Sequence, residues 1–118
     1  SDIVKGDRFA NKAVYCITDK GKQYFKDLML SCACQPIPLL FDFNVVITNL
    51  NKISKEDAHD LVAKLRDNIE SSLKTNEEYA VQYADIPFVG RTIFEQQKRL
   101  YQSLLEWLDD FESQYEKE

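Results

Sequence analysis

The sequence predicts a mainly α-helical chain, in which a short N-terminal β-hairpin is followed by about four helices. Apolar residues recur at spacings of three and four through the second half of the chain, which is typical of amphipathic helices. Sequences that favour helix capping precede several of these segments. With 118 residues, the chain is one domain or part of one.

The N-terminal hairpin is predicted from residues 13–17. In VYCI, alternate side chains would face opposite sides of a strand. Residues 2–4 supply a short partner strand, and the polar, basic stretch VKGDRFANK supplies the connecting loop.

Two helices are expected next. Thr18 favours an N-cap, so we expect the first helix over about 19–31. Pro36 and Pro38 exclude a regular helix in CACQPIPL. A second, short helix is expected over about 40–51. Its apolar face consists of Leu40, Phe43, Val46, Ile47 and Leu50.

The third helix has the clearest start signal. Ser54 is followed three residues later by Asp57, a pair close to a capping box. We expect the helix to continue to about Ala84. Its apolar stripe includes Ala58, Leu61, Val62, Leu65 and Ile69.

The fourth helix follows a turn marked by Pro87 and Gly90. Thr92 and Glu95 form a second capping pair, which predicts a helix from about Thr92 to Tyr115. The two C-terminal helices, each roughly 20 residues or about 30 Å long, form an antiparallel pair. The apolar face of the fourth helix is wider than one neighbouring helix would cover, so we expect a homodimer. The predicted dimer interface consists of Leu100, Leu104, Trp107, Leu108 and Phe111.

Composition and charge restrict the class of protein. No apolar run approaches the ~18 residues of a membrane span, and no signal-peptide segment is recognised near the N-terminus. We therefore expect a cytoplasmic protein without membrane contact. Residues 1–26 hold six bases and three acids, whereas the remaining chain holds nine bases and 17 acids. Residues 1–26 therefore carry a net positive charge, which suits them to lie near phosphates.

Catalytic motifs are missing, because the chain contains no Walker loop and no GxGxxG, GxSxG or HExxH sequence. We therefore expect no enzyme activity, no cofactor and no metal. Cys16, Cys32 and Cys34 are interpreted as reduced thiols, and a redox or metal site built from Cys32, Cys34 and His59 is the alternative. His59 is expected to be a solvated helix residue. A solvated acidic face on the fourth helix is expected to hold Asp109, Asp110 and Glu112.

Aromatic side chains are concentrated in the last 40 residues. Rings that line a space between helices can hold a planar ligand, although the same arrangement also fills a core or a dimer interface. A candidate ligand pocket is therefore assigned to Tyr79, Tyr83 and Tyr101, with packing as the alternative.

The segment VYCITDKGKQYF resembles the Y-x-[IL]-T-x-x-G sequence that ends the winged helix-turn-helix of PadR-type transcriptional regulators, through Tyr15, Ile17, Thr18 and Gly21. The proline-containing linker, the LSxEEA-like cap at residues 53–58 and the WL pair at residues 107–108 are similar to features of the longer members of this family. The resemblance implies that residues 1–33 are the end of a winged-helix domain, with the wing hairpin and a linker helix. Residues 34–118 would be a C-terminal helical dimerisation and effector domain.

The resemblance also implies a function. The chain would be the C-terminal dimerisation and ligand-sensing region of a PadR-like repressor, without the helix-turn-helix that reads DNA sequence. It would contact DNA only within the full-length regulator, where Lys5, Arg8 and Lys12 at the wing tip would touch phosphates. An effector, often a small aromatic molecule in this family, would shift the spacing of two DNA-binding heads. The alternative function is a stand-alone helical protein–protein interaction module unrelated to DNA binding.

Overall fold

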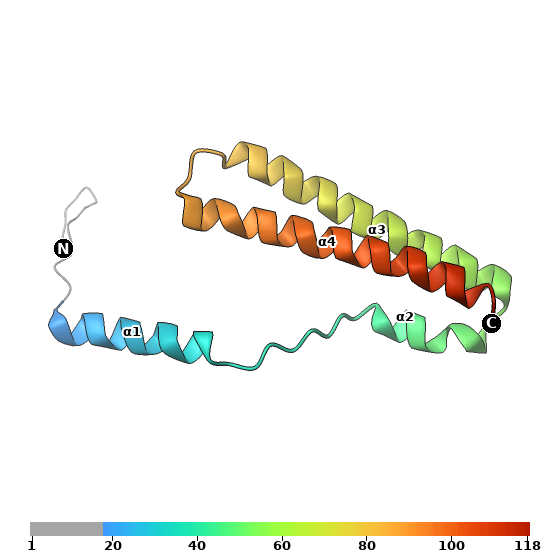
Figure 1. Cartoon of the computed structure of the whole chain (residues 1–118), viewed down its shortest axis with the longest axis horizontal. Coiled ribbons are helices and arrows are strands. Elements are labelled where there is room, and N and C mark those ends of the chain that lie inside the picture. Colours follow the sequence, from blue (N-terminus) through green and yellow to red (C-terminus); the bar gives the residue numbers. More distant parts are fainter. Residues whose placement is uncertain (1–17) are drawn as a thin grey trace, which may run out of the picture. The chain divides into compact units, whose positions relative to one another are not determined.

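A computed structural model describes residues 18–118, and this part of the chain is all-α (Figure 1). It contains four α-helices and one short 3-10 helix, and no strand occurs within it. The predicted hairpin, formed by residues 2–4 and 13–17, lies outside the described residues. The chain divides into two compact units, residues 1–39 and 40–118, and each is described by itself.

The first unit contains helix α1, Asp19–Ala33. The Thr18 side-chain oxygen accepts a hydrogen bond from the Gly21 N–H at 3.0 Å, which confirms the predicted N-cap. The helix ends at Ala33, slightly later than the sequence predicts. None of its side chains is buried, and its large apolar residues are all exposed: Tyr24, Phe25, Leu28, Met29 and Leu30.

The second unit begins with helix α2, Asn44–Asn49, and the 3-10 helix η1, Leu50–Lys52. The prediction that this helix begins at Leu40 is wrong, because residues 40–43 are not helical and Leu40 is exposed. The rings of Phe41 and Phe43 stack with their centroids 5.2 Å apart. Side chains two positions apart do not face each other on an α-helix, so this stack requires a different backbone conformation. The rest of the predicted apolar face does turn toward the core: Phe43, Val46, Ile47 and Leu50.

Helix α3, Lys55–Gln82, begins where the sequence predicts. The Ser54 hydroxyl oxygen accepts a hydrogen bond from the Asp57 N–H at 3.0 Å, which satisfies one of the free donors of the first turn. Most of the predicted stripe is buried, with Leu61 exposed at its edge. The buried residues of α3 are Ala58, Val62, Leu65 and Ile69.

Helix α4, Phe88–Tyr115, begins one turn earlier than predicted. Thr92 lies inside the helix, and Pro87 occupies the N-cap position instead. Proline suits a helix start because it lacks the N–H that would have no partner there. Gly90 sits in the first turn, where an added Cβ would lie 2.9 Å from Cδ1 of Ile86. This atom is the end of a flexible side chain, so a larger residue at position 90 would require only a shift of the Ile86 side chain.

Helices α3 and α4 lie side by side and antiparallel, joined by a short turn (Figure 1). The core of the unit lies at the end of the pair that α2 and η1 cover. Its buried members are Leu50, Ala58, Val62, Leu65, Ile69 and Leu108. We call residues 55–69 and 101–115 the base of the pair, and residues 70–82 and 88–100 the tip. No helix among residues 18–118 is long and apolar enough to cross a lipid bilayer.

Candidate interaction surface

The base is held together by an ion-pair cluster that joins the two long helices. Arg66 of α3 contacts Asp109 at 2.6 Å from Nη1 to Oδ1, and its other terminal nitrogen donates to the Glu112 carboxylate. The hydrogen bond to Glu112 is the main reason that the pKa of Arg66 rises above its ordinary value, against the opposing effect of burial. The guanidinium therefore stays charged at any ordinary pH.

This cluster corrects the expectation of a merely solvated acidic face. Asp109 remains largely exposed. Both Asp109 and Glu112 form ion pairs with Arg66, whereas Asp110 does not. The sequence does not reveal the cluster, because the pairing depends on the register between α3 and α4. The spacing of apolar residues shows on which face of its helix a residue lies, but not which residue of another helix it contacts.

A second set of contacts closes the end of the base. The Lys55 ammonium donates to the Tyr115 carbonyl at 3.1 Å and lies 4.0 Å from the centre of the Tyr115 ring. The Tyr115 hydroxyl donates to the Leu50 carbonyl at 3.5 Å, at the limit of a hydrogen bond. The C-terminal end of α4 is thus tied to both η1 and the start of α3.

Aromatic rings form a continuous column along the base of α4. Trp107 lies between Phe43 and Phe111, with ring centres at 6.2 Å and 6.0 Å, and Phe111 stacks on Tyr115 at 5.4 Å. Phe41 extends the column by stacking on Phe43. Distances in this range are typical of favourable aromatic pairs. The column fixes the segment before α2 against α4.

The five residues of the predicted dimer interface do not lie on one exposed face. Leu108 is 0% exposed, so it belongs to the core of its own chain and cannot contact a second copy. Leu104 and Phe111 are partly buried against the same core. Leu100 and Trp107 remain 46% and 37% exposed. The prediction fails for Leu108 because its position faces α3, whereas residues 100 and 107 lie on the neighbouring face of α4.

Exposed apolar residues on α4 instead form a second line beside the core-facing one. They are Val89, Ile93, Leu100 and Trp107, all at least 37% exposed. The polar residues Gln96 and Ser103 lie on the same line, at intermediate positions. We call these six residues the outward stripe. The spacing of the stripe places it along one face of the helix.

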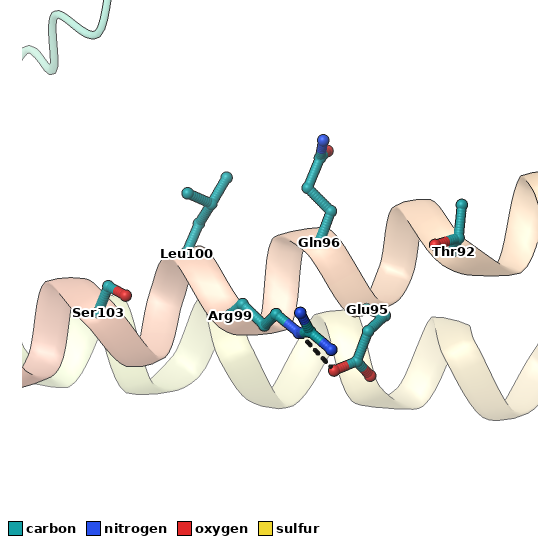
Figure 2. A pocket seen from close by; sticks show the side chains of 6 residues that line it. All are labelled: Thr92, Glu95, Gln96, Arg99, Leu100 and Ser103. Carbon is teal, nitrogen blue, oxygen red and sulfur yellow. Dashed lines mark hydrogen bonds and ion pairs between the residues drawn. The ribbon is translucent and has the colours of Figure 1, made fainter.

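Figure 2 shows part of this stripe from close by. Gln96 and Leu100 stand on the same side of α4 and point away from the neighbouring ribbon of α3. A shallow hollow of about 330 Å³ runs along the helix here, lined by Thr92, Glu95, Gln96, Arg99, Leu100 and Ser103. Arg99 Nε donates to Glu95 Oε2 at 3.0 Å along its rim. All lining residues come from α4, so this is an open hollow on the helix surface and not an enclosed pocket.

The candidate ligand residues lie in different parts of the helix pair, Tyr79 in the tip, Tyr83 just after α3 and Tyr101 at the start of the base section of α4. Tyr79 and Tyr101 line one hollow of about 260 Å³ together with Ser71, Ser72, Thr75 and Asn76. Tyr83 does not line it, and its ring stacks between Tyr79 and Phe94 at 6.4 Å and 6.3 Å. Tyr83 thus has a packing role, while Tyr79 and Tyr101 lie along an open hollow on the surface of the helix pair.

The remaining chemistry-bearing residues are spread out. His59 is exposed, and its Nε2 lies 3.9 Å from Glu116 Oε2. Cys32 and Cys34 are exposed free thiols in the first unit. No group of three or more metal-binding side chains occurs among residues 18–118. Lys5, Arg8, Lys12 and Cys16 lie outside the described residues.

Comparison of the chain with protein-family models, with curated proteins and with solved structures finds no match.

Proposed function

We propose that this chain is the C-terminal dimerisation and ligand-sensing region of a PadR-like, DNA-binding transcriptional repressor, without enzyme activity. The observation that carries the proposal is the outward stripe of α4, an exposed apolar line on a helix whose other apolar face is already covered by α3. Within residues 18–118, Val89, Ile93 and Leu100 of this stripe are open to a partner, whereas Trp107 is partly covered by Phe43 and Phe111.

The energy of burial supports a partner at the stripe. Fully burying an exposed Val, Leu or Ile side chain contributes about 1.5–3 kcal/mol. Ile93 and Leu100 are about half exposed, and Val89 is more exposed still. A symmetric dimer buries the same side chains on both copies, so each apolar residue of the stripe contributes twice.

The order of elements supports the regulator class. A capped helix follows the motif that resembles the end of a wing, then come a proline-containing linker, a capped long helix and a final helix with Trp107 and Leu108. In such a regulator the dimer holds two winged helices at a fixed spacing, and Lys5, Arg8 and Lys12 contact phosphates beside them. A small aromatic effector would enter the hollow beside Tyr79 and Tyr101 and change that spacing.

Sedimentation over about a hundredfold range of protein concentration tests the dimer. We expect a dimer for the natural sequence and a folded monomer for Leu100→Lys, which places a charge in the middle of the stripe. Val81→Lys is the matched control, because Val81 is an exposed apolar residue on α3 away from the stripe. A natural chain that stays monomeric throughout, or a Leu100→Lys variant that dimerises as well as the control, contradicts the proposal.

One observation favours a second function, a helical protein–protein interaction module unrelated to DNA. The large apolar residues of α1 are exposed, as are Ile37 and Leu39 in the linker, so the chain offers apolar surface outside the pair as well. Reversing Arg8 and Lys12 to glutamate in a regulator that carries the helix-turn-helix separates the two functions. Loss of two phosphate contacts lowers affinity for all DNA sequences and reduces the salt slope by about two. Unchanged DNA affinity favours the interaction module.

A further inference from the structure

Two exposed thiols lie at the C-terminal end of α1. Cys32 belongs to the last turn of the helix and Cys34 is its C-cap, with Ala33 between them. Both cysteines are free and exposed, and the proposed function uses neither of them. Because the thiolate of cysteine is a strong nucleophile, the two residues form a reactive pair that small molecules in solution can reach.

The helical backbone keeps the two sulfur atoms apart. Each residue of an α-helix turns the chain by about 100°, so side chains two positions apart point to nearly opposite sides. Cys34 still has helical backbone angles, with φ at −99° and ψ at 0°. Its N–H donates to the carbonyls of Leu30 and Ser31 at 3.1 Å and 3.3 Å, which holds it in the last turn. A disulfide needs Cβ atoms about 3.8 Å apart that point toward each other. The two thiols can therefore join only if the end of α1 unwinds.

The end of α1 can unwind at little cost. None of the side chains of this 15-residue helix is buried. A helix of this length is only marginally stable without packing, and unpacked helix ends open most readily. Pro36 and Pro38 already exclude a regular helix beyond Cys34. An earlier end of α1 therefore moves an existing boundary and disrupts no other element.

From this geometry we propose that Cys32 and Cys34 are a site of reversible oxidation, at which a small-molecule disulfide of the glutathione type joins them and thereby shortens α1. A disulfide between residues so close in sequence closes too short a loop to add much stability. Exposed or strained disulfides are also the ones that are readily reduced again. The pair therefore suits a redox switch and not a structural crosslink, and this inference does not depend on the proposed dimer.

The reaction consists of two thiol–disulfide exchanges. The thiolate of one cysteine attacks a sulfur atom of glutathione disulfide, which breaks that S–S bond, forms a mixed disulfide and releases one glutathione thiolate. The thiolate of the other cysteine then attacks the protein sulfur of the mixed disulfide and releases the second glutathione. The two protons lost by the cysteines go to the two released thiolates. One disulfide is thus reduced for each one formed, and excess reduced glutathione reverses both steps.

Oxidation changes where α1 ends. The ring that joins positions 32 and 34 is incompatible with helical spacing, so the helix ends before Cys32 instead of at Ala33. The non-helical segment between α1 and α2, which contains Pro36 and Pro38, becomes longer by the residues of the last turn. A longer linker transmits less of the orientation of one unit to the other.

Equilibration of the full chain in glutathione redox buffers tests the site. After alkylation of the remaining thiols, mass spectrometry identifies the disulfide by the loss of two hydrogen atoms from tryptic peptide 27–52, which contains both cysteines. We expect this product to decrease as reduced glutathione increases. Cys32→Ser and Cys34→Ser should instead retain the mixed disulfide with glutathione. Cys16→Ser is the control, and it should leave the disulfide unchanged.

A second pair of variants tests the link between the disulfide and the helix end. Ala33→Gly weakens the last turn of α1, and the difference in helix propensity between the two residues predicts an equilibrium constant for oxidation about fivefold higher. Gly21→Ala makes the reverse exchange in the first turn and should leave oxidation unchanged. Hydrogen exchange gives a direct readout, because the N–H of Cys34 loses its helical partners on oxidation and should exchange faster.

The outcomes are distinct. A reversible disulfide between Cys32 and Cys34, favoured by Ala33→Gly and accompanied by faster exchange in the last turn, supports the switch. The switch is overturned if no such disulfide forms at any glutathione ratio, if Cys16 is required, or if the cysteines only link two copies in non-reducing electrophoresis. A disulfide that is insensitive to Ala33→Gly overturns the coupling to helix unwinding. Sedimentation of the reduced chain tests the dimer separately, so failure of the switch and failure of the proposed function are distinguishable.

Discussion

The base and the tip of the α3·α4 pair are built from the same two helices but differ in how much they bury. Every fully buried residue of the pair lies in the base, where Leu50 and the residues around it add a third element. The tip has no buried residue, and its contacts are partly exposed, such as the stack of the Phe94 ring on Tyr83 just after α3. Two helices alone leave their side chains open on at least one side.

The difference shows what a helical pair needs in order to be complete. In the base, the covering element supplies apolar contacts while Arg66 and Lys55 join the helices by charge and hydrogen bonds. In the tip, Ile93 and Leu100 keep about half of their surface exposed. A layer of secondary structure is stable when another layer covers its apolar face. The base has that layer within the chain, whereas none of the described residues supplies such a layer to the tip.

Leu108→Ala should have the largest effect, because it removes a fully buried side chain of the base. We expect the free energy of unfolding to fall by about 2–5 kcal/mol. Leu100→Ala is the tip counterpart and should lower the stability of the separated chain by less than about 1 kcal/mol. Urea unfolding at low protein concentration measures both. Equal losses at the two positions would contradict the contrast between base and tip.

Arg66→Ala should have an intermediate effect. It removes the contacts with Asp109 and Glu112 from a side chain that is 25% exposed, and we expect a loss of about 1–2 kcal/mol. Lys64→Ala, an exposed position on the same helix, serves as the control and should change stability by under about 0.5 kcal/mol. Thermal unfolding of the two variants gives the comparison. If Arg66→Ala and Lys64→Ala are indistinguishable, the ion-pair cluster does not stabilise the base.

Ser54→Ala should have a smaller effect than Arg66→Ala, a loss of about 1 kcal/mol from the missing N-cap of α3. Thr92→Ala tests the predicted N-cap of α4 at Thr92, because the structure has Pro87 at the N-cap position instead. Because Thr92 lies inside α4, alanine should be neutral or slightly stabilising through its higher helix propensity. Chemical unfolding of both variants distinguishes them. A loss at Thr92 as large as that at Ser54 would place the start of α4 at Thr92 after all.

Local chemistry made much of the secondary structure predictable. The N-caps at Thr18 and Ser54 depend on neighbouring backbone groups, and the structure confirms both. The start of α4 was missed because a Thr–Glu pair at capping distance also fits inside a helix, and the proline ahead of it provides the earlier start. The apolar spacing places Leu40 in the helix, but residues 40–43 are not helical, and the ring stack of Phe41 on Phe43 found there is not visible in helical periodicity.

Sequence periodicity by itself determined that the C-terminal helices are amphipathic and where most of the buried residues of α3 lie, because both follow from spacing along a single helix. Tertiary structure alone decided which part of the wide apolar face of α4 meets α3. It assigned Leu108 to the core and left Leu100 and Trp107 partly open. It also brought Arg66 to Asp109 and Glu112, since residues more than 40 positions apart meet only when two helices pack in one register.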